Sequence, residues 1–307
     1  MKTTWLVCLT LLIVVISPTR AVHAQEPVAR QVALDGDITR IYLTGAAELH
    51  VNQGEEQYVR LTTSQAQVDK ILARVRGRSL YLGWDIAEQG EYWGEDHRGE
   101  PVRYDVQLAQ LDALRVRGSG HAFLGNLVAR RLKLIMLGSG NIDAESIHAE
   151  DLRIEIAGSG EVDAKQIVVE EMGIEVAGNT SINIETLTAA ELEIDIAGNA
   201  DIDIPNLQTE ELETEISGNA HIDLAGRAGT QDLEINGAGD YNTPDLVSDY
   251  VYLEIRGNGD VVVAVEKDLT AELARGAELE YYAGPDLKVD ISGRGDARQV
   301  GNIRKNE

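Results

Sequence analysis

The sequence predicts an all-β protein folded as a single-stranded parallel β-helix, a solenoid with about 20 residues in each coil. Three observations predict this fold. A Gly-[Ser/Asn]-x triplet recurs at the same interval six times in succession, apolar residues keep fixed offsets from each glycine, and only 5% of the 307 residues are aromatic. A chain rich in Val, Ile and Leu suits thin stacked layers better than a thick globular core. We expect right-handed coils, because crossovers between parallel strands almost always have that hand.

The glycine triplets are predicted to form the corners of the coils. Glycine takes a positive φ without steric cost, and a sharp corner between two strands needs such a residue. The asparagines that follow three of the glycines can stack and hydrogen-bond along the solenoid axis. The predicted corner residues are Gly118, Gly138, Gly158, Gly178, Asn179, Gly198, Asn199, Gly218 and Asn219. Turn chemistry accounts for all of them, so we assign them a structural role and name no catalytic residue.

Apolar residues at fixed offsets from the glycines predict the strands and the core. They alternate with polar residues, which is the period-two pattern of half-buried strands. Equivalent residues of successive coils would stack in rows, because neighbouring strands lie about 4.8 Å apart. The row four residues before the glycine is Leu114, Leu134, Ile154, Ile174 and Ile194, and the row four residues after it is Ile142, Val162, Ile182, Ile202 and Ile222. Thr214 interrupts the first row at the sixth coil.

Residues 1–24 are predicted to be a signal peptide. Lys2 supplies a positive start, and the apolar run from Trp5 to Ile16 is too short to span a bilayer. Small residues before Gln25 offer a cleavage site. We therefore expect an exported protein, located in the periplasm, at the outer membrane or on the cell surface. Cys8 is the only cysteine and lies in this segment, so the mature chain would have no disulfide, catalytic thiol or cysteine metal site.

The formal net charge of −25 argues against two classes of partner. Removing residues 1–24 takes away Lys2 and Arg20 and no acid, which changes the charge from −25 to −27. A chain this acidic repels nucleic acid and anionic lipid surfaces. No stretch after the signal peptide is long and apolar enough to predict a transmembrane segment.

The remainder of the chain divides into three predicted parts. Residues 25–105 form an N-terminal β region, in which Ile41–Leu49 already follows the pattern of a coil. Residues 106–300 form the parallel β-helix, and residues 301–307 form a polar tail. Terminal repeats of a solenoid are expected to depart from the consensus, since they close an open edge.

An acidic loop over residues 83–103 breaks the rhythm of the N-terminal region and carries Trp84, Tyr92 and Trp93. Aromatic faces stack on sugar rings and acids bond to hydroxyl groups, so these three residues are the predicted glycan contact. The alternative is an insertion whose tryptophans fold back and cap the solenoid, because large aromatic side chains usually pack.

Outward positions of the predicted coils also repeat, and many of them are acidic. Carboxylates about 5 Å apart repel by roughly 1 kcal/mol per pair in water, and a bridging hard cation would reverse that sign. Calcium is therefore a hypothesis for the row five residues after the glycine, which contains Asp143, Asp163, Asp203 and Asp223. The alternative is a solvated acidic face, diluted by basic residues such as Lys133 and Arg153. The glycine-rich repeat of calcium-binding β-rolls is absent from the sequence, which favours that alternative.

The chain resembles the putative auto-transporter adhesin "head GIN domain" family, a group of exported bacterial proteins. The resemblance covers Val32 to Asp296 and rests on the signal peptide, the early strand-Gly-strand unit and the Gly-Ser-Gly and Gly-Asn series. It implies a β-helical protein of the cell envelope or surface with no established catalysis, and it brings no catalytic residues. The acidic loop over residues 83–103 departs from the family pattern.

We therefore predict a non-catalytic, adhesin-like module that presents a β-helical face to a glycan or to an envelope or surface protein, with no required cofactor. One alternative is a polysaccharide lyase or hydrolase, since β-helices include such enzymes, although the acids here recur with the structural period instead of clustering. A second alternative is a structural or signalling component of the envelope that assembles through an exposed end of the solenoid. The sequence leaves the oligomeric state open.

Overall fold

The structure, a computed structural model, describes residues 28–64, 71–84, 102–274 and 276–303. The regular elements of these ranges are all strands, so this part of the chain has no helix that could cross a membrane. The predicted signal peptide lies outside the described residues. The strands are β1 (Val28–Ala33), β2 (Arg40–Thr44), β3 (Glu48–Gln53), β4 (Tyr58–Thr63), β5 (Ile71–Arg76), β6 (Ser79–Trp84), β7 (Arg103–Leu108), β8 (Ala113–Gly118), β9 (His121–Gly138), β10 (Asn141–Gly158), β11 (Glu161–Thr188), β12 (Glu191–Ile196), β13 (Asn199–Ile216), β14 (Asn219–Ile235), β15 (Ala238–Ile255), β16 (Asp260–Leu273), β17 (Glu278–Ala283), β18 (Lys288–Gly293) and β19 (Asp296–Asn302).

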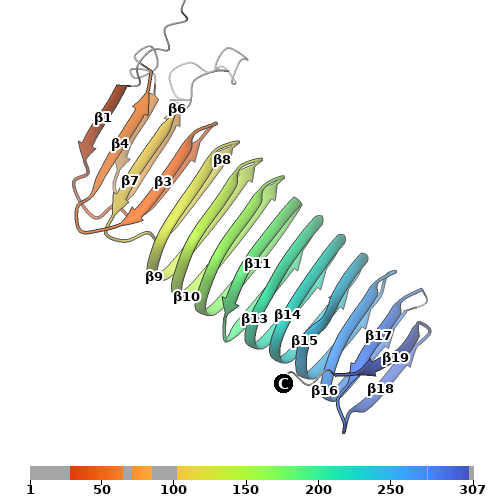
Figure 1. Cartoon of the computed structure of the whole chain (residues 1–307). Helices are drawn as coiled ribbons and strands as arrows, with labels where there is room; N and C mark the ends of the chain where they lie inside the picture. Colours follow the sequence, from red (N-terminus) through yellow and green to blue (C-terminus); the bar gives the residue numbers. More distant parts are fainter. Residues whose placement is uncertain (1–27, 65–70, 85–101, 275, 304–307) are drawn as a thin grey trace, which may run out of the picture.

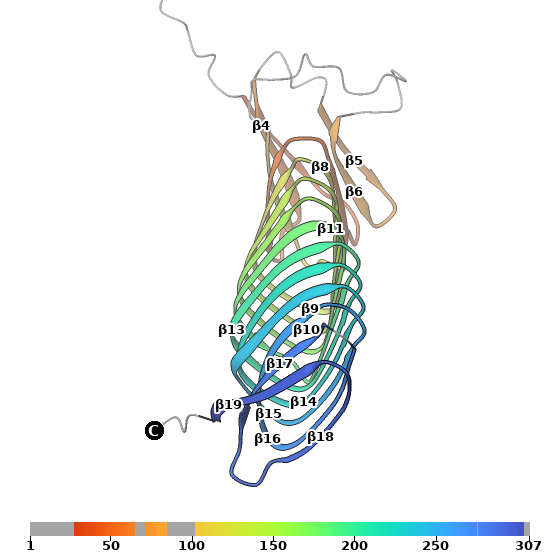
Figure 2. The same ribbon diagram turned by 90° about the vertical axis from the view of Figure 1, so that its right-hand side faces the viewer.

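The strands wind into a β-solenoid of about nine turns, which confirms the predicted fold. Neighbouring coils pair in parallel, and between β10 and β11 the register runs from Asn141↔Glu161 to Gly158↔Gly178. Figure 1 shows the coils as successive rungs along the molecule, and Figure 2 shows each coil as a flattened loop around a narrow interior. Each residue therefore lies beside its equivalents in the coils before and after it.

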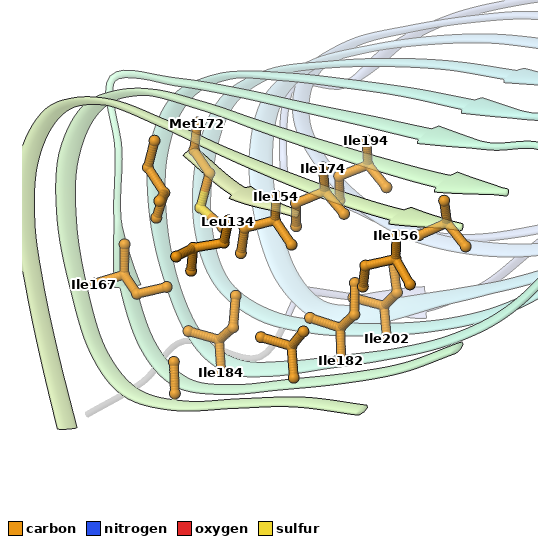
Figure 3. Packing of buried hydrophobic residues seen from close by; sticks show 14 of the residues in the cluster. Leu134, Ile154, Ile156, Ile167, Met172, Ile174, Ile182, Ile184, Ile194 and Ile202 are labelled. Atoms are coloured by element: carbon orange, nitrogen blue, oxygen red, sulfur yellow. The ribbon is translucent and has the colours of Figure 1, made fainter. Parts of the chain in front are cut away.

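The predicted apolar rows line the interior. The row that includes Leu134, Ile154 and Ile174 is at most 1% exposed, and Ile182 on the facing wall is fully buried (Figure 3). Burying one such side chain contributes about 1.5–3 kcal/mol. Because such rows run through successive coils, the stabilisation is distributed along the axis.

The corner glycines are required for two different physical reasons. Gly118, Gly138 and Gly158 have φ values of +109°, +139° and +148°, as expected for a corner. The next three corner glycines lie outside the positive-φ region. A Cβ added at Gly178 would lie 1.9 Å from the carbonyl oxygen of Gly158 in the preceding coil, and one added at Gly158 would lie 2.0 Å from that of Gly138. The later corners therefore need glycine because two coils approach closely, and positive φ does not explain them.

The corner asparagines form a ladder along the axis. Asn199 Nδ2 donates to Asn179 Oδ1 at 2.5 Å, and Asn219 Nδ2 donates to Asn199 Oδ1 at 3.1 Å. Each amide thus bonds to its equivalent one coil away, which ties neighbouring corners together without any ligand.

Thr214, which interrupts the apolar row four residues before the corner glycines, lies close to a buried polar network. Thr214 is 1% exposed and pairs in register with Leu233 on the next coil. Two residues before Leu233, Gln231 accepts a hydrogen bond from Tyr241 Oη at 2.8 Å and donates one to Ser248 Oγ. Burial raises the pKa of Tyr241 well above its ordinary value, so this network stays neutral.

The stack of coils begins earlier in the sequence than residue 106. β2 pairs in parallel with β8, and β3 pairs in parallel with β9, so Ile41–Leu49 is the coil that precedes the one at Gly118. On the outer side of this coil lie β6 and β7, which pair in parallel with β2 and β3. The strands β2 and β3 thus come before β6 and β7 in the sequence, although β6 and β7 lie nearer the N-terminal end of the stack.

Antiparallel strands are added to both walls of the solenoid at this N-terminal end. β4 pairs with β7, β1 pairs with β4, and β5 pairs with β6, all antiparallel. The inward residues of the outermost parallel layer are covered, since Leu80 and Tyr104 are both fully buried. Tyr104 Oη accepts a hydrogen bond from the backbone N–H of Gly83 at 2.9 Å.

The predicted acidic loop is shorter than residues 83–103, because Gly83 and Trp84 complete β6 and Arg103 begins β7. Tyr92 and Trp93 lie outside the described residues, and so does the side chain of Trp84.

Candidate functional site

A hollow of about 620 Å³ lies on the outer face of the solenoid just after the corners. Its walls are outward side chains of β3, β9, β10 and β11, and we call it the trough. One row along the trough is His50, Phe123, Asp143, Asp163 and Asn183, and the second is Asn52, Gly125, Glu145, Lys165 and Glu185. The parallel register brings these residues together, since equivalent positions of successive coils lie side by side.

A stack of aromatic rings lies at the N-terminal end of the trough. The ring centroids of Phe123 and His50 are 4.6 Å apart, and those of Phe123 and His121 are 4.0 Å apart. The planes are inclined by only 20° and 30°. Phe123 is the only phenylalanine of the chain, and it occupies an outward position that later coils fill with Asp143, Asp163, Asn183, Asp203, Asp223 and Asn242.

The aspartates predicted as calcium ligands form one row on the surface, and those in register are neighbours. This row contains Asp143, Asp163, Asp203 and Asp223. Asp143 Oδ2 lies 2.7 Å from His121 Nε2, and Asp163 accepts a hydrogen bond from Asn183 at 2.8 Å. Asn242 donates to Asp223 at 2.6 Å. Within the described residues no group of three or more such side chains could hold a metal ion, and calcium binding stays a prediction.

The charge of the trough is negative. Lys165 Nζ donates to Glu145 Oε2 at 2.7 Å across the rim, and this contact raises the pKa of Lys165. The remaining lining carboxylates, which are those of Asp143, Asp163 and Glu185, outnumber this single lysine. A net negative hollow disfavours anionic ligands and favours neutral or basic ones.

A second feature is an acidic patch on β11, β12 and β13, before the corners. It comprises Glu171, Glu175, Glu191, Glu193, Asp195, Glu211, Glu213 and Glu215. A shallow groove of about 420 Å³ runs beside it over Ala157, Ala177 and Ala197. Burial and the neighbouring carboxylates, Glu193 foremost, raise the pKa of Asp195. Arg153, 3.8 Å from Glu175, borders the patch on the N-terminal side.

The strand that follows the predicted glycan contact begins near the trough. Arg103 is the first residue of β7, and its Nη1 lies 3.4 Å from Glu48 Oε1. Glu48 in turn contacts His50 at the end of the trough. Tyr92, Trp93 and the side chain of Trp84 lie outside the described residues, so the glycan contact stays a prediction.

Sequence reasoning missed His50, Phe123 and His121. The signal that could have found Phe123 is its place five residues after Gly118, where an aromatic ring breaks an otherwise polar row. No local signal places His50 beside it, because β3 and β9 are far apart in the chain and become neighbours only through the N-terminal arrangement of strands.

The comparisons with known proteins agree with this architecture. A family model described as "Putative auto-transporter adhesin, head GIN domain" matches residues 37–206 and 173–285. No curated protein matches the chain.

Three solved structures are similar over nearly their whole length. A putative adhesin from Parabacteroides distasonis ATCC 8503 is 18% identical with a TM-score of 0.53, and the match covers 90% of this chain and 98% of that one. A putative lipid binding protein from the same organism is 18% identical with a TM-score of 0.52, covering 90% and 97%. A putative adhesin from Parabacteroides merdae ATCC 43184 is 15% identical with a TM-score of 0.50, covering 90% and 96%. At these identities the similarity shows the fold alone. The two family matches together span residues 37–285, and the chain belongs to the putative auto-transporter adhesin, head GIN domain, family.

Proposed function

We propose that the protein is a non-catalytic binding module of the cell envelope or surface, and that it holds a neutral or amino-sugar glycan in the trough. The observation that carries this proposal is the stack of Phe123 with two histidines beside a row of carboxylates and amides. Aromatic side chains offer a large apolar surface to the C–H face of a sugar. Carboxylate and amide groups accept and donate hydrogen bonds to its hydroxyl groups.

The shape of the trough supports an extended ligand. Its two rows run along the solenoid axis over four strands, so a chain of sugars could lie across successive coils. The family and two of the similar solved structures are named as putative adhesins, which is consistent with a partner outside the cell. The predicted signal peptide points to the same location.

The acidic loop that carries the tryptophans adds a second contact to this proposal. Trp84, Tyr92 and Trp93 would extend the binding surface beyond the ring stack, since Arg103 brings the chain back beside Glu48. In this arrangement the trough binds the glycan, and Trp84, Tyr92 and Trp93 increase the affinity.

The experiment is a glycan array followed by calorimetry with the best oligosaccharide. Phe123→Ala removes the centre of the ring stack and should weaken binding at least 10-fold, while Asp143→Asn should weaken it less. Trp93→Ala tests the second contact. Tyr252→Ala is the matched control, because Tyr252 is 43% exposed on β15, outside the trough.

Equal affinity for the wild type and the Phe123→Ala protein would refute the trough as the site. A preference for polyanionic sugars would contradict the charge argument. The enzymatic alternative is tested with the same oligosaccharides: release of new reducing ends or unsaturated products would replace the binding module with a hydrolase or lyase. Fractionation of the producing cells tests the proposed envelope or surface location.

A further inference from the structure

One outer face of the N-terminal coils carries arginines and, among its described residues, no carboxylate. The registers of β5, β6, β2 and β8 place the outward residues of these strands side by side, before the corner. These residues are Arg74, Arg76, Ser79, Tyr81, Arg40, Tyr42, Thr44, Ala113, Arg115 and Arg117. The formal net charge of the chain is −25, so this face is basic in a protein that is acidic as a whole. We call it the arginine face.

Two stacked tyrosines lie on the arginine face. The ring centroids of Tyr42 and Tyr81 are 4.8 Å apart, and the ring planes are inclined by 11°. Arg115 Cζ lies 5.8 Å from the centroid of Tyr42, and Arg76 Cζ lies 6.0 Å from the centroid of Tyr81. Because β8 and β6 lie on opposite sides of β2, and β5 and β2 on opposite sides of β6, each ring lies between the other ring and an arginine. Cation–π attraction orients the two guanidinium groups without using their N–H donors.

These arginines differ from the basic residues further along the solenoid. Each lysine and arginine described between residues 141 and 283 has a carboxylate oxygen within 4.0 Å, and these residues are Arg153, Lys165, Arg227, Arg256 and Lys267. Among the described residues, Arg40, Arg76 and Arg115 have no such partner, and all three are exposed. Asp112, at the edge of the face, is paired with Arg78 at 3.7 Å. The donors of the three arginines are therefore available to an anion.

We propose that the arginine face binds the acidic groups of a linear polysaccharide, and that Arg40, Arg76 and Arg115 are the binding residues. A guanidinium group donates two parallel N–H bonds to a carboxylate or a sulfate, and its planar fork fits both groups. The three arginines come from β2, β5 and β8, so they span four adjacent strands about 4.8 Å apart. Several acidic groups of one sugar chain can therefore be bound at once.

Carboxylates further along the same face limit the shape of the ligand. In the register of Arg115, the next two coils carry Ile135 and Glu155. Glu175 and Asp195 continue this row. Glu155 is two strand spacings from Arg115, which is about 10 Å. A planar anionic membrane over the arginine face would also lie over these carboxylates and be repelled. A narrow chain that runs parallel to the strands contacts the arginines alone.

The tyrosine stack argues against single-stranded nucleic acid as the ligand. Proteins that bind such strands stack the bases on open aromatic faces. The faces of Tyr42 and Tyr81 are already covered by each other and by Arg115 and Arg76. The arginine face therefore recognises the charge of its ligand, and an acidic polysaccharide supplies that charge without needing a ring to stack on.

The arginine face is separate from the trough. The trough follows the corners of the coils and is negatively charged, whereas the arginine face precedes the corners. The two sites are thus proposed for different ligands, and the failure of one proposal leaves the other intact. Binding of an acidic sugar that Arg115→Glu removes belongs to the arginine face. Binding that Phe123→Ala removes belongs to the trough, and the charge argument for the trough concerns that binding alone.

The test is calorimetry at low salt with two probes, an oligogalacturonate and a sulfated heparin oligosaccharide. The wild type should bind at least one of them, and the affinity should fall as salt is added. Arg115→Glu should weaken binding at least 10-fold, and Arg40→Glu/Arg115→Glu should abolish it. Arg115→Lys keeps the charge but loses the planar fork, so it should weaken binding less. The two probes distinguish carboxylate from sulfate as the preferred group.

The matched control is Arg298→Glu. It makes the same reversal of charge on β19, at an arginine that is 72% exposed and already paired with Glu280, and it should bind like the wild type. Thermal melts of the variants check that each is folded, which the exposure of Arg115 and Arg298 leads us to expect.

Three results would overturn the proposal. The first is a wild type that binds neither oligosaccharide, as it would if carboxylates outside the described residues already paired with the arginines. The second is an equal loss of affinity in Arg115→Glu and Arg298→Glu, which would reflect net charge alone. The third is tighter binding to phosphatidylglycerol vesicles or to single-stranded DNA than to either oligosaccharide, since the ligand would then be a membrane or a nucleic acid.

Discussion

The stack of coils ends differently at the two ends of the solenoid. At the N-terminal end, β1, β4 and β5 add in antiparallel fashion, and the inward residues Leu80 and Tyr104 are fully buried. At the C-terminal end, the last parallel coil stops, and Val289 is 44% exposed in a row whose previous member is buried. At the N-terminal end the edges of the described stack are the added antiparallel strands β1 and β5, whereas at the C-terminal end they are the parallel strands β18 and β19 themselves.

The difference teaches that stability is not uniform along the axis. In a repeat protein each coil contacts mainly its neighbours, so an end opens independently of the middle. We expect the covered N-terminal end to open only with the body of the protein, and the C-terminal end to open first. Four predictions test this comparison.

The largest effect is expected from truncating an inward side chain at the covered end. Leu80→Ala leaves a cavity in a fully buried site and should cost about 2–5 kcal/mol in unfolding free energy. Val289→Ala, on the last strand of the C-terminal end, should cost less than about 1 kcal/mol, because that side chain is already 44% exposed. Urea denaturation of both variants gives the two values. Similar losses at the two sites would break the comparison.

The second effect uses two glycines with nearly the same local geometry. A Cβ at Gly83 would lie 2.1 Å from the carbonyl oxygen of Thr44, and one at Gly293 would lie 2.1 Å from that of Leu273. Their φ values are +117° and +100°. Gly83→Ala should cost about 2–4 kcal/mol because the surrounding strands hold the site, whereas at Gly293 the last coil can lift away. Hydrogen exchange should show that the second variant loosens only β18 and β19.

The third effect concerns a buried hydroxyl. Tyr104→Phe leaves the N–H of Gly83 without that acceptor and should cost about 1–2 kcal/mol, whereas Tyr281→Phe at the half-buried C-terminal site should be nearly neutral. Burial also raises the pKa of Tyr104 well above its ordinary value of 10.0. The ionised form is thus disfavoured in the folded state, so the contribution of Tyr104 to stability should be constant below pH 10 and fall above it. An alkaline titration in which Tyr104→Phe shows the same decline as the wild type would contradict this assignment.

The smallest effect concerns the acidic patch on β11, β12 and β13, which is another region of the solenoid that could have low local stability. Burial, together with Glu193 and its neighbours, raises the pKa of Asp195 above 3.8, so its charged form destabilises the fold. Asp195→Asn should add a few tenths to about 1 kcal/mol at neutral pH, and this gain should vanish as the pH falls below the unfolded-state value. Hydrogen exchange should show extra protection in β11, β12 and β13 alone. If these strands instead opened before β18 and β19 in the wild type, the ends would not be the weak points.

The repeated part of the fold could be predicted because its rules are local. Whether Ile154 or Ile174 points inward depends on the period-two alternation, and their stacking depends on the constant interval between glycines. The reason for glycine at each corner could not be predicted. Positive φ at Gly118 and close approach at Gly178 both require the absence of a side chain, so the sequence looks the same in the two cases.

The candidate site was predicted less well. The row of Asp143 and Asp163 follows from the repeat, but the ring stack does not, since His50 reaches Phe123 only because β3 lies directly beside β9. β3 lies beside β9 because β6 and β7, which come between them in the sequence, pair on the other side of β2 and β3. The order of strands in the sequence does not give the order of layers in space.

By itself, the sequence determined the coil, its corners and its inward rows, because each of these depends on residues one or two positions apart or one repeat apart. Only the tertiary structure decided which end is covered, where the trough lies and which strand edges remain at the C-terminal end. These features depend on non-local strand pairing, whose partners are chosen by burial and backbone hydrogen bonding over the whole molecule.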